Sequence, residues 1–204
     1  MTQVVTVRPL RVLALVDEAN VVGAARLFNK RVDWEETRKY IASETEGREL
    51  VEIVLYAGLP PVNMAEFEEA RQGKLRFVHA LRTRGFLVVT KDGAPRDSGN
   101  GGHRHYKANV DTLLAIDAMD LATEIKPDVV VLLAGDGDFA HLALTLRRRG
   151  IRVEVAAVDQ NLANELRAAA NSVIDLRTLF NRFENLRADR INQIGGEDVL
   201  DPIS

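Results

Sequence analysis

The chain has 204 residues, of which 46% are apolar and 28% charged, with a formal net charge of −3, values that are typical of one globular domain. No apolar run approaches the roughly 20 residues that cross a bilayer, and residues 1–10 lack the form of a secretory signal, so we expect a cytoplasmic protein and no membrane partner. The absence of cysteine excludes disulfides, thiolate catalysis and thiolate zinc sites, which leaves oxygen and imidazole as metal ligands.

The first half of the chain alternates apolar runs with helical patterns. Residues 11–17 form a continuous apolar run that ends in an acid, as a central parallel strand buried on both faces does. Helical stretches begin near residues 20 and 34, and 50–56 is a second strand, closed by Gly58 and two prolines. This order indicates an α/β protein.

The next segment is basic. Residues 64–84 predict a long helix, 86–90 a short strand, and 91–106 a polar, glycine-rich loop that we expect to be long and mobile. From 71 to 107 there are nine Lys or Arg against two Asp, a balance of +7, so the other residues carry −10. Charge segregated in this way favours binding to a polyanion.

The second half of the chain repeats the alternation. We expect helices over 108–125, from 139 to 149, and over 161–170, and strands over 128–134 and 151–156, the latter alternating as a strand near the sheet edge would, with a strand remnant at 173–174. Strands alternating with helices of this length predict a parallel, doubly wound sheet. The tail after about residue 190 has no pattern that predicts packing.

Four aspartates fall where this topology predicts one shared edge. Asp17 ends the first strand, Asp136 and Asp138 follow the 128–134 strand, and Asp111 lies in the first turn of the preceding helix. Carboxylates held close together raise one another's pKa unless a cation neutralises them, and oxygen ligands alone select Mg²⁺ or Mn²⁺. The pattern therefore predicts metal-assisted phosphodiester hydrolysis.

Other polar residues allow two interpretations. Asn20 either caps the first helix or positions a metal-bound water or phosphate, and Lys107 either pairs with Asp111 or holds a substrate phosphate. Asp117 shares an apolar helix face, which favours a buried structural acid over a metal ligand. The remaining candidates are assigned no function: His79, His103, His105, His141 and the arginines 147–149, which suit a helix C-terminus.

Together these motifs resemble the NYN domain family, the LabA-like branch of the PIN-like nucleases. The family pattern is matched by Asp17-Glu-Ala-Asn20, by Lys107-Ala-Asn-Val-Asp111, and by Gly135-Asp136-Gly137-Asp138-Phe139. The resemblance covers 11–180, with 1–10 as an N-terminal extension and 181–204 as a polar C-terminal helix and tail. The chain departs from the family pattern at Ala134, Gly137 and Asn171.

The resemblance implies a Rossmann-like three-layer sandwich and an RNA substrate. It makes Asp17, Asp111, Asp136 and Asp138 the ligands of Mg²⁺ or Mn²⁺, and it makes Asn20 a residue that arranges the site. The basic segment, with Arg104 and Lys107, then becomes the track for the phosphate backbone.

Three functions follow from these observations. The first is a metal-dependent ribonuclease, and the second is a non-catalytic RNA-binding or regulatory module on the same fold. A phosphatase of the haloacid dehalogenase type is set aside, because that chemistry needs a second Asp two residues after the first, where this chain has Ala19. Endo or exo cleavage, the number of metals and a homodimer all stay open.

Overall fold

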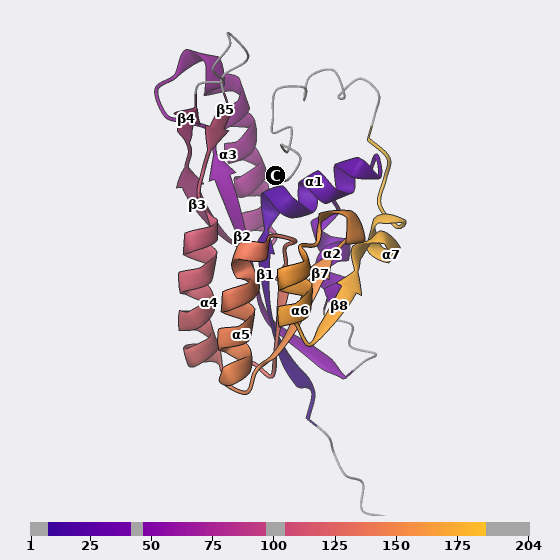
Figure 1. The fold of residues 1–204 in the computed structure, drawn as a ribbon. Coiled ribbons are helices and arrows are strands. Elements are labelled where there is room, and N and C mark those ends of the chain that lie inside the picture. The colour runs from indigo at the N-terminus through magenta and orange to yellow at the C-terminus, as the bar shows by residue number, and fades with distance from the viewer. Residues whose placement is uncertain (1–7, 42–46, 97–104, 187–204) are drawn as a thin grey trace, which may run out of the picture.

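The centre of the protein is a six-stranded parallel sheet with the strand order β3-β2-β1-β6-β7-β8 (Figure 1). The computed structural model describes residues 8–41, 47–96 and 105–186. The chain adds β2 and β3 on one side of β1 and then crosses over to add β6, β7 and β8 on the other. The six strands are β1 (Leu10–Asp17), β2 (Arg48–Leu59), β3 (Leu87–Asp92), β6 (Val129–Leu133), β7 (Arg152–Ala157) and β8 (Ser172–Asp175).

Helices cover both faces of the sheet, which confirms the predicted three-layer α/β sandwich. Alternate residues of β1 face opposite ways: Val12, Ala14 and Val16 pack in one apolar cluster, and Leu13 and Leu15 pack in the other. The first cluster is covered by α1 (Glu18–Leu27), α2 (Trp34–Ile41), α3 (Glu68–Thr83) and α7 (Leu176–Phe180), and the second by α4 (Asp111–Ile125), α5 (Ala140–Arg148) and α6 (Asn164–Ala169).

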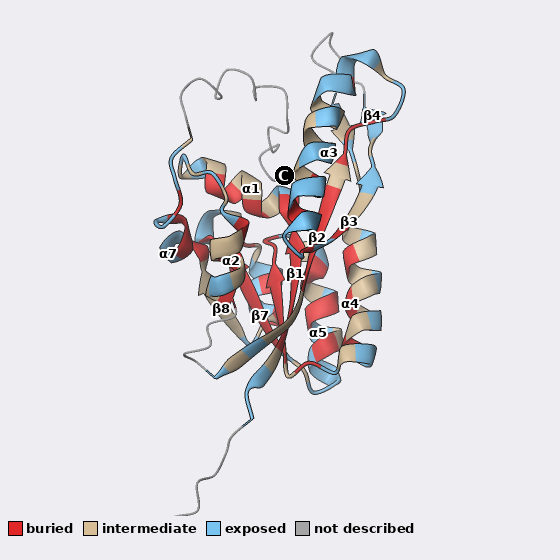
Figure 2. Ribbon diagram, turned by 180° about the vertical axis from the view of Figure 1, so that it is seen from behind, coloured by how far each residue is buried: buried red, intermediate tan, exposed pale blue. Residues whose placement is uncertain are grey.

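Burial follows the layers. In Figure 2, β1, β7 and the second half of β2 are mostly red, the edge strands β3 and β8 are mostly tan or pale blue, and the outer faces of the helices are pale blue or tan. Three short 3₁₀ turns join the elements, η2 (Ala65–Phe67), η3 (Gly137–Phe139) and η4 (Asp159–Asn161). Within the described ranges, no helix combines the length and the hydropathy needed to cross a membrane.

The expected loop over 91–106 is partly a hairpin, so the prediction was wrong for its two ends. Strand β4 (Ala94–Arg96) pairs antiparallel with β5 (His105–Lys107). The ring of Tyr106 packs edge-on against Phe67 at 5.7 Å. A side chain on Gly93 would begin 2.4 Å from the Tyr106 ring, so the glycine leaves room for it. Residues 97–104 lie outside the described ranges.

Strand β7 lies one strand in from the sheet edge, between β6 and the edge strand β8. Its alternation comes from Glu154, which is only 2% exposed. Arg48 donates to both carboxylate oxygens of Glu154, at 2.8 and 3.0 Å, and Arg152 donates at 2.7 Å. Burial opposes ionisation of Glu154, but the two arginines outweigh it and lower the pKa of this carboxyl.

The start of the expected C-terminal helix is also different. Residues 181–186 contain no helix. Phe183 is buried instead, Lys30 donates to the Phe183 carbonyl at 3.1 Å, and Asn185 forms an isolated antiparallel bridge with Lys30. This segment therefore belongs to the packed domain.

The buried ion pair gives a stability prediction. We expect Arg48→Met to lower the free energy of unfolding by about 3 kcal/mol at neutral pH, because it leaves a buried carboxylate with one cation. Urea denaturation measures the loss. Arg31→Met is the matched control, since Arg31 pairs with an exposed Glu184 and should barely change the midpoint. Equal effects of the two substitutions would contradict this account of Glu154.

Candidate functional site

The topology creates one edge where ligands are expected to bind. Successive strands are added in opposite directions from β1, so the sheet reverses its order between β1 and β6. In doubly wound sheets, ligands bind at the carboxyl ends of the strands that flank such a reversal. Asp17 ends β1, and Asp136 is the third residue after β6, so both acids lie at this point.

Asp17 is the most constrained of the four acids. It is 8% exposed, and its Oδ1 accepts a hydrogen bond from the Asn20 amide at 3.1 Å, which caps α1. Burial raises the pKa of the Asp17 carboxyl to about 6, and the charges of Asp111 and Asp136 add to the effect, while the Asn20 amide opposes it. Asp17, and not Asn20, is therefore the cap of α1, so the capping interpretation of Asn20 was wrong.

The structure brings the other three aspartates into electrostatic contact with this site. Asp111 opens α4 and is half-buried, and its pKa is raised by burial first and then by Asp136 and Asp138, while Lys107 lowers it. Asp136 and Asp138 are exposed, and Asp136 Oδ1 accepts from the Asp138 amide at 2.9 Å. The four acids therefore form one cluster, built from three separate segments of the chain.

The cluster suits a hard cation chemically, because it offers only oxygen donors and carries unrelieved repulsion. Within the described part of the chain, however, no three acidic or histidine side chains already converge on one ligand position. The exposed side chains of Asp136 and Asp138 would have to turn toward Asp17 to complete a coordination sphere. We conclude that the donors fit a divalent cation and that the ligand geometry is not preformed.

Sequence reasoning missed Asn161. It ends η4, which follows β7, and its Nδ2 donates to Asn20 Oδ1 at 3.2 Å. Its own Oδ1 is buried and has no hydrogen-bond partner among the described residues, so it can accept from a ligand or water at the edge. The sequence contained a signal for Asn161, because it follows a predicted strand, and residues that follow parallel strands lie at the same edge of the sheet.

Gly135 fixes this asparagine against the end of β6. A Cβ at Gly135 would lie 1.9 Å from the Asn161 carbonyl oxygen, so any side chain there would displace η4. The Ala163 amide donates to the Gly135 carbonyl at 2.9 Å. The segment after β7 therefore packs against the loop that carries Asp136 and holds its backbone in place.

Asp117 of α4 lies next to Tyr56 of β2, on the sheet face that α4, α5 and α6 cover. Burial, followed by the charge of Asp117, raises the pKa of the Tyr56 hydroxyl far above its usual value. The charges that shift the pKa values of Asp17 and Asp111 do not include Asp117. This position favours a structural role for Asp117, as its helix face predicted.

The expected basic track is partly occupied by internal contacts. Lys74 pairs with the buried Glu18 at 2.6 Å, Arg71 pairs with Asp92 at 2.7 Å, and Lys91 donates to the Asn109 carbonyl at 3.1 Å. Lys107 is exposed beside Asp111, where a substrate phosphate could reach it. Arg104 and His103 lie outside the described residues, whereas His79, His105 and His141 are exposed.

Comparison with known proteins gives a consistent result. A model of the NYN domain family matches residues 11–177. The Synechococcus elongatus protein named Low amplitude and bright protein LabA is 30% identical over 173 residues, covering 84% of this chain and 87% of that protein. A crystal structure of a Vibrio parahaemolyticus protein of unknown function superposes with a TM-score of 0.61 at 25% identity, covering 82% of this chain and 93% of the other.

The burial of Asp17 predicts how stability depends on pH. The unfolded carboxyl titrates near 3.8 and the folded one near 6, so the folded state holds its proton longer and the free energy of unfolding falls between about pH 4 and pH 6. We expect Asp17→Asn to remove this loss and to stabilise the protein at pH 7 by on the order of 2–3 kcal/mol. Asparagine still caps α1.

Urea denaturation at pH 4.0 and pH 7.0, in chelator, measures this effect. The control is Asp33→Asn, because Asp33 also accepts a hydrogen bond in the first turn of a helix but is exposed. Asp17→Asn should stabilise the protein only at the higher pH, and Asp33→Asn should change little at either. Destabilisation by Asp17→Asn at pH 7.0 would show that the carboxylate is compensated in the fold.

Proposed function

This chain belongs to the NYN domain family of PIN-like nucleases, and on that premise we propose that it is a metal-dependent ribonuclease that hydrolyses RNA phosphodiester bonds. The observation that carries the proposal is the gathering of Asp17, Asp111, Asp136 and Asp138 at the point where the sheet reverses its strand order. A fold has no structural need for neighbouring acids whose charges raise the pKa values of Asp17 and Asp111.

The four acids differ in how firmly the fold holds them. Asp17 and Asp111 are fixed by β1 and by the first turn of α4, whereas Asp136 and Asp138 are exposed, and the Asp136 carboxylate caps η3. We propose that all four act as ligands or as ligands of metal-bound water. A bound Mg²⁺ or Mn²⁺ supplies polarisation of a phosphoryl oxygen and a lower pKa for an attacking water.

Polar neighbours then position the substrate. The amide pair of Asn20 and Asn161 lies beside Asp17, and the free Oδ1 of Asn161 can orient a water or a ribose hydroxyl. Lys107 is placed to hold a phosphate next to Asp111, and we propose that Arg104 extends this contact along the strand. These contacts favour a single strand that crosses the carboxyl edge.

A second function is favoured by one observation, the absence of three converging ligand side chains in the part of the chain that the structure describes. An NYN domain that binds RNA without cutting it would need the basic residues but no closed metal site. The two functions differ in their dependence on metal, and the following experiments separate them.

Cleavage of labelled RNA tests catalysis. We expect wild type to cut single-stranded RNA with Mn²⁺ or Mg²⁺ and not with chelator, and we expect Asp136→Asn, Asp138→Asn to lose activity about a hundredfold or more. Asp120→Asn is the matched control, because it removes an exposed acid of α4 away from the cluster. Binding without cleavage in every condition would favour the non-catalytic module.

Thermal unfolding tests the metal separately from catalysis. Saturating Mn²⁺ should raise the midpoint of wild type, since a ligand present at about 100 times its dissociation constant stabilises the folded state by about 2.7 kcal/mol. The double asparagine variant should show little shift. If both proteins respond equally to Mn²⁺, the four aspartates do not hold the cation.

A further inference from the structure

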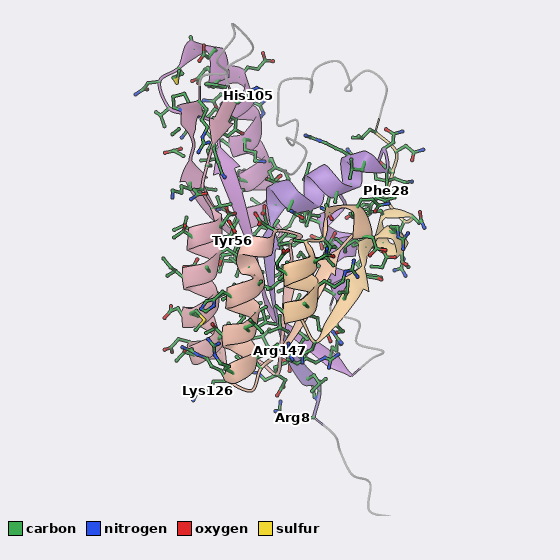
Figure 3. All side chains as sticks on the ribbon, in the orientation of Figure 1. Arg8, Phe28, Tyr56, His105, Lys126 and Arg147 are labelled. Atoms are coloured by element: carbon green, nitrogen blue, oxygen red, sulfur yellow. The ribbon has the colours of Figure 1, made fainter. Side chains whose placement is uncertain are left out.

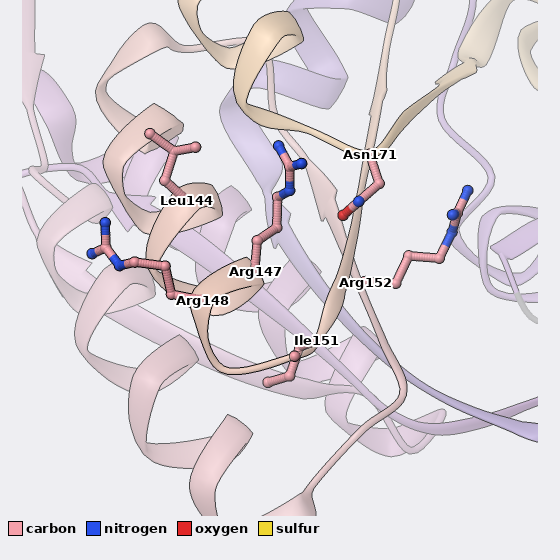
Figure 4. Close-up of a pocket in the computed structure, with 7 residues that line it drawn as sticks. Leu144, Arg147, Arg148, Ile151, Arg152 and Asn171 are labelled. Atoms are coloured by element: carbon pink, nitrogen blue, oxygen red, sulfur yellow. The ribbon is translucent and has the colours of Figure 1, made fainter.

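A groove of about 550 Å³ lies on the sheet face that α1 and α3 cover. Its walls come from α1, the start of α2, α3 and residues 184–186, which are the last residues that the structure describes. A second cavity, of about 650 Å³, lies at the amino ends of the strands (Figure 4). There the side chains of Arg147, Arg148 and Arg152 point apart and share no ligand position, so the groove is the better candidate for a binding site.

One part of the groove is apolar and aromatic. The rings of Trp34 and Phe77 form a tilted pair with centroids 6.4 Å apart, and Val22 and Val32 line the same space. Phe77 and the two valines are only partly buried by the rest of the domain. This lining favours a ligand that brings aliphatic side chains.

The charged part of the groove is positive on balance. Its lining contains four basic residues and two acids, namely Arg26, Lys30, Arg31 and Lys74 against Glu18 and Glu184. Lys74 is committed to the buried Glu18, whereas the Arg31–Glu184 pair is exposed on both sides and contributes little. Lys30 donates to the Phe183 carbonyl, and within the described ranges it pairs with no carboxylate. The groove therefore favours a ligand that also brings acids.

The described chain ends in the wall of this groove. Residues 184–186 run antiparallel to the segment that follows α1, and the Leu186 amide donates to the Asn29 carbonyl at 3.0 Å. Phe28, labelled in Figure 3, packs against Phe180 of α7 with ring centroids 6.0 Å apart, which holds this end of α1 against α7. The chain therefore reaches residue 186 beside α1 and directed toward the C-terminal end of that helix.

The sequence that follows matches the groove in charge and in apolar content. Residues 191–204 contain three acids, no basic residue and five aliphatic residues. The acids are Glu197, Asp198 and Asp201, and the aliphatic residues are Ile191, Ile194, Val199, Leu200 and Ile203. No other class of ligand needs to be supplied from outside the chain to satisfy both parts of the groove.

The length of the segment is also sufficient. Residues 187–199 can span up to about 45 Å when extended. The lining of α1, from Arg26 to Glu18, rises by about 12 Å. The chain can therefore pass along the groove, reverse at Gly195 and Gly196, and return.

We propose that residues 197–203 of this chain bind in the groove, with Val199 and Leu200 against Phe77 and with their neighbouring acids close to Lys30. A segment tethered in this way has an effective concentration on the order of millimolar, so weak contacts are enough to hold it. The binding does not depend on the proposed ribonuclease function, because neither metal nor RNA takes part in it.

Paramagnetic relaxation in the full chain tests the proposal. The chain has no cysteine, so Ser204→Cys gives one site for a nitroxide label next to the segment. We expect the label to broaden the amide signals of Val22 and Gly73, in the groove, and to leave those of Asp120 and Thr145 on the opposite face unchanged. Adding Val199→Ser, Leu200→Ser should abolish the broadening, since it keeps the charge and removes the apolar contacts.

Lys30→Gln tests the contribution of charge from the side of the groove. Glutamine can still donate to the Phe183 carbonyl, so the domain keeps this contact, but the broadening at Gly73 should weaken. Lys39→Gln is the matched control, because it removes the same charge from a residue of α2 that does not line the groove, and it should change nothing.

Four outcomes would overturn the proposal. These are no broadening at Val22 and Gly73, equal broadening after Val199→Ser, Leu200→Ser, equal effects of Lys30→Gln and Lys39→Gln, or full transfer of the broadening from a labelled copy to a separate isotope-enriched copy, which would assign the groove to a second molecule. The Asp136→Asn, Asp138→Asn protein should show the same broadening as wild type. That result would support the groove whether or not the ribonuclease assignment holds.

Discussion

The buried carboxylate of Asp17 constrains everything built at the carboxyl edge. It is the last residue of the central strand, it caps α1, and it lies in register with Tyr56 of the neighbouring strand, so it cannot move to solvent without disturbing the sheet. With a pKa near 6 it is mostly ionised at neutral pH, at a cost in folding free energy. Such a cost persists in a protein when the charge serves a ligand. The exposed acids that follow β6 add negative charge beside Asp17, and a bound cation would neutralise this charge.

Parallel α/β architecture also explains why acids and arginines separate in space. The helices that follow each strand start at the carboxyl edge, so their positive dipole ends lie near Asp17, Asp111 and Asp138. The same helices end at the amino edge, where their negative ends favour Arg147 and Arg148. The net charge of −3 conceals this polarity. Acids therefore lie at one end of these helices, and Arg147 and Arg148 lie at the other, because every strand-to-helix connection runs in the same direction.

The acid cluster was predictable because each aspartate is marked locally, at the end of an apolar run or the start of a helix. Asn161 was not, because its place depends on β7 lying beside β6 and on the close approach that Gly135 permits. The hairpin after β3 was missed for a similar reason, since Tyr106 finds its partner Phe67 far away in sequence. Glu154 makes the sequence of β7 alternate between apolar and charged residues, although the side chain is buried and two arginines neutralise its charge inside the fold.

Asp17 is buried, whereas Asp136 and Asp138 are exposed, and this difference affects how the carboxyl edge of the sheet could select a ligand. Gly135 and Asn161 hold the backbone after β6, yet the side chains of Asp136 and Asp138 remain exposed. A site whose ligands all converge before binding holds its cation in every state of the protein. In the proposed site, Asp136 and Asp138 would have to reorient toward the cation, and Lys107 would offset the charge of a phosphate bound beside Asp111. In that site, cation and RNA would bind with positive cooperativity, because the cation offsets the repulsion between the acids and the phosphate, and coupling between two bound ligands is reciprocal.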